Sequence, residues 1–154
     1  MFEKILVCLD GSTLAEQIIP CATEVALRFQ STLVLLHAVP QPVMNMPGLP
    51  GAPGVPIETT GMVERMQLQQ NEAQSYLEHL AHQLRDKNLT VETVLLHGNP
   101  AKIILPYAAE NDISLIALAT HGRGGLGRAV FGSVADEILR NSRVPILIIR
   151  PTNI

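Results

Sequence analysis

The residues best suited to chemistry lie in a glycine-rich segment, 119–133, which also carries Arg123 and Arg128. The apolar run before it, 113–118, predicts a buried strand, and the stretch after it, 134–140, predicts a helix. Glycines allow close approach of the backbone, so that several N–H groups can point at one anion. The free N–H groups of the following helix, its dipole and the two guanidinium groups favour the same ligand. The segment therefore predicts a loop that holds phosphate.

Two common phosphate-binding motifs do not fit this loop. Gly122, Gly124 and Gly127 have the spacing of the dinucleotide fingerprint, but the acidic residue that it needs about 20 positions later is missing. That distance falls in the apolar run around Leu147, and the clearest helix pattern begins only after Gly132. A Walker A loop needs a Lys after its glycines, and none follows here.

Strand and helix patterns alternate along the chain and must position this loop. Such alternation indicates an α/β fold, with a parallel sheet covered by helices on both faces. Hydrophobic residues make up 47% of the chain and aromatic residues 3%, which is typical of an aliphatic parallel sheet. The predicted strands are 5–9, 32–39, 90–96, 113–118 and 145–151, and the predicted helices cover 13–30, 58–87, the residues after Pro100, and 134–140.

Several residues predict where helices begin. Thr13 and Glu16 fit a capping box at the start of the first helix. Pro20, inside the same pattern, predicts either a kink or a helix that starts late. Asn99 followed by Pro100 is typical of an N-cap with proline at the first helical position.

A Pro-, Gly- and Met-rich segment at about 40–57 interrupts the alternation. Its prolines exclude a helix or a central strand. A loop of this length in a compact domain is a lid, a binding loop or a disordered insert, and the sequence does not decide among them.

Length and charge limit the class of protein. A chain of 154 residues fits one domain, and a net charge of -3 argues against a nucleic-acid-binding surface. No apolar run approaches the ~18 residues that span a membrane, and the first residues show no signal-peptide pattern. We therefore expect a cytoplasmic protein without a membrane or nucleic-acid partner. The sequence does not exclude a disulfide between Cys8 and Cys21, but it favours two free thiols.

The order of these segments resembles the universal stress protein family, whose small members have one flavodoxin-like, doubly wound domain. The family's ATP-binding motif is Gly, two residues, Gly, nine residues, Gly, then Ser or Thr. Here the motif reads Ala119, two residues, Gly122, nine residues and Gly132-Ser133. Segments 7–12 and 36–39 also match, so the resemblance covers residues 1–154 as a single domain.

The resemblance implies a five-stranded sheet of order 3-2-1-4-5 with an adenine nucleotide at the switch point. It implies that Asp10 accepts hydrogen bonds from the ribose and that the backbone of Ala38 meets the adenine edge. The ligand would be ATP, ADP or AMP, alone or with Mg²⁺ or Mn²⁺. The implied binding residues are Leu9, Asp10, Ala38, Leu118, Ala119, Gly122, Arg123, Gly132, Ser133 and Val134.

Purely structural interpretations of the same residues are also open. Asp10 also fits a turn that caps the first helix with Ser12, and the glycine loop also fits a plain connector. Ala119 replaces the first glycine of the motif, which costs little if its φ is negative and roughly 1 kcal/mol if φ is positive.

Three functions remain open on this basis: a nucleotide-dependent stress-response regulator with an unknown client protein, a slow ATPase, and an interaction protein that binds no nucleotide. The regulator is favoured, because hydrolysis needs groups that orient water and hold Mg²⁺, and Asp10 alone among the acidic residues is placed for this. The segment Pro145 to Pro151 is apolar on both faces, which predicts an edge strand that pairs in a homodimer. The resemblance implies the same dimer.

Overall fold

Strands and helices alternate through the computed structural model, which describes residues 1–41, 59–121 and 131–152. Gly122, Arg123, Arg128 and most of the predicted 40–57 loop lie outside the described residues. The elements are β1 (Lys4–Leu9), α1 (Thr13–Glu16), α2 (Ile18–Phe29), β2 (Thr32–Val39), α3 (Thr59–Arg85), β3 (Thr90–His97), α4 (Pro100–Glu110), β4 (Leu115–Ala119), α5 (Ser133–Asn141) and β5 (Ile146–Ile149).

The five strands form one parallel sheet in the order β3-β2-β1-β4-β5. This confirms the predicted order and the doubly wound α/β fold. From the central strand β1 the chain first builds the sheet outward to β3, and then returns to build β4 and β5 on the other side. The carboxyl ends of β1 and β4 therefore flank the switch point.

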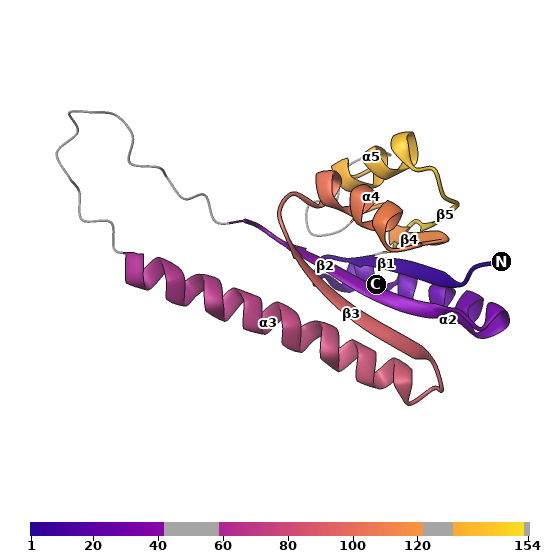
Figure 1. Ribbon diagram of the computed structural model, residues 1–154, viewed down its shortest axis with the longest axis horizontal. Helices are drawn as coiled ribbons and strands as arrows, with labels where there is room; N and C mark the ends of the chain where they lie inside the picture. Colours follow the sequence, from indigo (N-terminus) through magenta and orange to yellow (C-terminus); the bar gives the residue numbers. More distant parts are fainter. Residues whose placement is uncertain (42–58, 122–130, 153–154) are drawn as a thin grey trace.

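Two hydrophobic cores cover the two faces of the sheet. Side chains of β1 point alternately into the two cores, with Ile5 and Val7 in one core and Leu6 in the other. The first core also contains residues of α2 and α3, and the second contains residues of α4 and α5. Figure 1 shows this division, with α4 and α5 on one side of the sheet and α2 and α3 on the other.

The start of the first helical stretch differs from the prediction. Ser12, rather than Thr13, is the N-cap of α1, and its hydroxyl accepts a hydrogen bond from the N–H of Ala15 at 3.1 Å. The predicted capping box of Thr13 and Glu16 is therefore wrong. Pro20 predicted either a kink or a helix that starts late, and the structure shows the second. The helix α1 ends at Glu16, and a separate helix α2 begins at Ile18 with Pro20 in its first turn. A first-turn N–H lacks a helical partner anyway, so proline is tolerated there.

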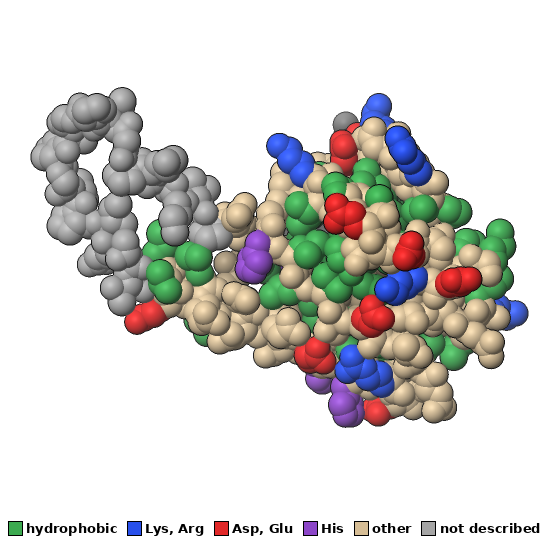
Figure 2. Space-filling model, viewed as in Figure 1, with side chains coloured by type: hydrophobic (Ala, Val, Ile, Leu, Met, Phe, Trp, Pro, Cys, Tyr) green, Lys and Arg blue, Asp and Glu red, His purple; other side chains and the backbone are tan. Residues whose placement is uncertain are grey.

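The helix α3 is longer than the face of the sheet that it covers. Its C-terminal half buries Leu77, Leu80 and Leu84 against β2 and β3, whereas Met62 and Val63 near its start are 43% and 59% exposed. Figure 1 shows this first half extending past the strand ends, and Figure 2 shows hydrophobic side chains gathered there. Within the described ranges, no helix is long and apolar enough to cross a membrane.

The two cysteines are both free thiols in contrasting environments. Cys8 lies in β1 and is buried, and burial raises its pKa from 9.0 to about 12. Cys21, on α2, is exposed. Since the thiolate is the reactive species, the two residues should differ sharply in reactivity.

We expect a thiol reagent such as Ellman's reagent to titrate one group in the native protein and both in denaturant. Cys21→Ser should abolish the fast native reaction, and Cys8→Ala should leave it unchanged. Absorbance kinetics at neutral pH would measure both. Rapid native labelling of the Cys21→Ser protein would contradict the burial of Cys8.

Candidate functional site

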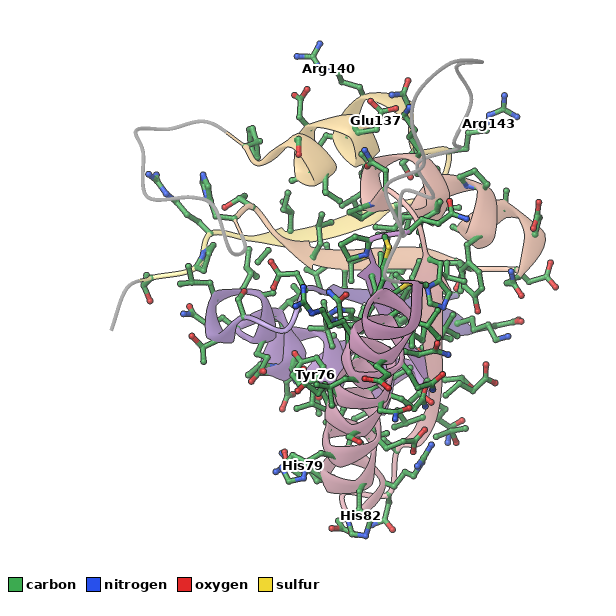
Figure 3. The ribbon with its side chains drawn as sticks, turned by 90° about the vertical axis from the view of Figure 1, so that its left-hand side faces the viewer. Tyr76, His79, His82, Glu137, Arg140 and Arg143 are labelled. Atoms are coloured by element: carbon green, nitrogen blue, oxygen red, sulfur yellow. The ribbon has the colours of Figure 1, made fainter. Side chains whose placement is uncertain are left out.

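A cleft of about 960 Å³ lies along the carboxyl ends of the strands. Its walls include Asp10 and Gly11 after β1, residues 37–41 at the end of β2, and residues 98–100 after β3. The first turn of α5 and one side of α3 complete the described part of the lining. In Figure 3 this edge of the molecule is turned toward the viewer. A cleft of this volume at the switch point is where open α/β sheets bind small ligands.

The carboxylate of Asp10 organises the turn after β1. Its Oδ1 accepts hydrogen bonds from the N–H of Ser12 at 2.9 Å and from the Ser12 hydroxyl at 2.6 Å. Gly11 between them has φ of 80°, which glycine adopts without strain. The turn thus places Ser12 as the cap of α1 while Asp10 lines the cleft. Asp10 therefore has the structural role that the sequence left open, which is to form the turn that caps the first helix with Ser12.

The first turn of α5 supplies free N–H groups to the opposite wall. Gly132 is the N-cap of α5 and has no side chain to cap it. Within the described part of the chain, the N–H groups of Ser133 and Val134 donate to no acceptor, and both residues line the cleft. Free N–H groups and the positive end of a helix dipole together attract an anion.

Gly132 also joins the start of α5 to the end of β4. Its N–H donates to the Thr120 carbonyl oxygen at 2.8 Å. A Cβ at this position would lie 3.2 Å from the same oxygen, a tight contact. Glycine therefore allows the two ends of the intervening loop to meet, which holds α5 next to the strand ends.

Ala119 fits its position without backbone strain. It belongs to β4, where it pairs with Ile149 of β5. The non-glycine residues with positive φ in the described ranges are Gln30, Asn88 and Asp112, so Ala119 is not among them. Replacement of the motif's first glycine therefore carries no left-handed penalty here.

The predicted binding residues that the structure describes divide into two groups. Asp10, Ala38, Ser133 and Val134 lie together around the cleft. The side chains of Leu9 and Leu118 instead pack into opposite cores and are 5% and 3% exposed. These two residues, like Ala119 and Gly132, do not appear in the lining. Gly122 and Arg123 lie outside the described residues.

A wall of the cleft that the sequence did not predict comes from α3. Tyr76 packs edge-on against His37 of β2, with ring centroids 5.8 Å apart and planes at 71°. Both rings line the cleft together with Gln69, Glu72 and Ala73. Figure 3 shows Tyr76 nearer to the sheet than His79 and His82, which point away from it. Among the described residues no three His, Cys, Asp or Glu side chains converge as a metal site.

A model of the universal stress protein family matches residues 1–150. The chain belongs to this family. A curated relative, the universal stress protein YxiE of Bacillus subtilis, is 31% identical over 150 residues, which is 97% of this chain and 100% of YxiE.

Solved structures of other members show the same fold. The universal stress protein UspA of Lactobacillus plantarum superposes with a TM-score of 0.79 at 21% identity, covering 97% of this chain and 98% of UspA. A family member from Arabidopsis thaliana, solved with AMP bound, has a TM-score of 0.61 at 16% identity, covering 97% of this chain and 92% of its own.

The turn at Asp10 yields a stability prediction. Asp10→Ala removes the acceptor of two hydrogen bonds and should lower the free energy of unfolding by about 1–2 kcal/mol. Asp10→Asn keeps an oxygen in place of Oδ1 and should change it by less than about 0.7 kcal/mol. Urea unfolding followed by circular dichroism would compare them. Equal losses in both variants would show that the charge, and not the turn geometry, matters.

Proposed function

We propose that this universal stress protein binds ATP, or a related adenine nucleotide, and acts as a stress-response regulator whose binding to a client protein depends on the nucleotide. One observation carries the proposal. The cleft at the switch point has free N–H groups of α5 at one wall and the His37–Tyr76 ring pair at another. A neutral base and an anionic phosphate need these two different environments. The AMP found in the Arabidopsis relative supports the same ligand class.

The ligand would lie with its phosphates against α5 and its base against β2 and α3. Ser133 and Val134 would donate N–H groups to phosphate oxygens, helped by Gly122 and Arg123 of the glycine loop. Asp10 would accept from ribose hydroxyls, and the Ala38 backbone would meet the base. Leu9, Leu118 and Ala119 would contribute through their backbone at the strand ends. Mg²⁺ or Mn²⁺ would enter bound to the phosphates.

The first test is to purify the protein without added nucleotide, denature it and identify any released small molecule by mass spectrometry. Adenine nucleotide near one molecule per chain, or binding of added ATP in calorimetry, is expected. An empty chain that also fails to bind ATP would favour the interaction protein that binds no nucleotide.

The helix N-terminus can be tested with one substitution. Ser133→Pro removes an N–H donor from the first helical position, where proline is well tolerated. Gly132 has φ of -58° and ψ of 157°, which suits a residue before proline. We expect affinity for ATP to fall by roughly 10-fold, the effect of one hydrogen bond to a charged group, with little change in stability.

Ser133→Ala is the matched control, because it keeps the N–H and removes only the hydroxyl. Calorimetric titration of both variants with ATP would separate the two groups. Unchanged affinity in Ser133→Pro would exclude this wall as the phosphate site.

We further propose that the chain forms a homodimer through β5. β5 is an edge strand of apolar, half-buried residues. The carbonyl groups of Pro145 and Ile149 accept from β4, so the alternation of a parallel strand directs the polar backbone groups of Ile146 and Ile148 outward. An exposed apolar edge of this kind favours pairing with a second strand.

Ile148→Pro should therefore weaken the dimer, because it removes an outward N–H while the hydrogen bonds to β4 remain. Light scattering at micromolar concentration should show a dimer for the natural chain and a larger monomer fraction for the variant. Circular dichroism would verify that the variant is folded. A natural chain that is monomeric at this concentration would refute the dimer.

A further inference from the structure

One side of α3 presents polar groups to the cleft at the wall that holds the ring pair. Gln69, Glu72 and Tyr76 follow one another at helical spacings of three and four, so they share a face of the helix. Ala73 lies between them in the lining and leaves space, since its side chain is a single methyl group. The wall therefore combines an amide, a carboxylate and an aromatic ring.

Gln69 and Glu72 differ in their side-chain bonding from Gln67 and Gln74, which also lie on α3. Gln67 donates to Asn71 at 3.2 Å, and Gln74 donates to Glu78 at 3.3 Å. Gln69 and Glu72 are exposed, and neither side chain forms a hydrogen bond or ion pair with another described residue. A ligand in the cleft could therefore bind these two side chains without breaking a contact between described residues.

The chemistry of this pair matches the edge of adenine. A Gln amide can accept from the exocyclic amino group of adenine and donate to a neighbouring ring nitrogen. An ionised carboxylate only accepts hydrogen bonds, so it suits the amino group and repels the carbonyl that guanine has at the same position.

We propose that α3 selects the base of the bound nucleotide: Gln69 and Glu72 bind the amino edge of adenine, and His37 and Tyr76 pack against the base. This inference rests on the proposed function, and it makes Gln69 and Glu72 specificity-determining residues. The glycine loop and α5 would hold phosphates of any nucleotide, and α3 would discriminate among bases.

The test titrates ATP, GTP and inorganic triphosphate into the natural chain and into Gln69→Ala and Glu72→Gln. The natural chain should prefer ATP to GTP. Gln69→Ala should weaken ATP binding by roughly 5-fold and Glu72→Gln by roughly 10-fold, the sizes of a neutral and a charged hydrogen bond. Glu72→Gln should also narrow the preference for ATP over GTP, because an amide can donate to the guanine carbonyl. Binding of triphosphate should not change.

Gln70→Ala and Glu64→Gln are matched controls, since both residues are exposed on α3 and neither lines the cleft. The proposal is supported if the two control variants bind ATP as tightly as the natural chain while Gln69→Ala and Glu72→Gln bind it more weakly. Normal ATP affinity in the two variants, or a natural chain that prefers GTP, would overturn it while leaving nucleotide binding intact. A natural chain that binds neither ATP nor triphosphate would overturn the proposed function itself.

Discussion

Pairing of β1 with strands on both of its sides is the constraint on which the rest of the structure depends. β2 pairs along the full length of β1 on one side, and β4 pairs with Ile5, Leu6 and Val7 on the other. Crossovers between parallel strands are right-handed, so helices that build the sheet in opposite directions must cover opposite faces. α2 and α3 therefore pack on one face, and α4 and α5 on the other. The reversal next to β1 leaves the cleft at the carboxyl ends.

This constraint also decides which groups can reach a ligand. Leu9 at the end of β1 and Leu118 near the end of β4 have their side chains packed into opposite cores. Side chains enter the cleft from the turns after the strands, from His37 of β2 and from α3. A family motif rich in glycine is consistent with such a site, because backbone N–H groups would bind the proposed ligand.

Local patterns in the sequence were enough to predict the order of elements. Asn99 caps α4 with Pro100 in its first turn as predicted, since one side chain and one ring determine that helix start.

The contact between His37 and Tyr76 could not be predicted, because it joins β2 to α3 and depends on how the helix is rotated on the sheet. Gly98 and Asn99 follow β3 and could have been assigned to the cleft from the strand-end rule alone. The cap at Ser12 depends on the Asp10 turn, which local pattern did not resolve.

Hydrogen bonds through Thr120 connect the start of α5 to the edge strand β5. Thr120 accepts from Gly132 at the start of α5 and donates its N–H to the Ile149 carbonyl at 2.9 Å. Gln17, between α1 and α2, exchanges hydrogen bonds of 2.8 and 2.9 Å with the backbone of Thr152 after β5. The start of α5 is therefore connected to β5 by two hydrogen bonds in series, through Thr120. On the proposed function, the N–H groups of the first turn of α5 would hold the phosphates of a bound nucleotide. Through this connection, a bound nucleotide would act on the strand that forms the proposed dimer edge, as the proposed regulator requires.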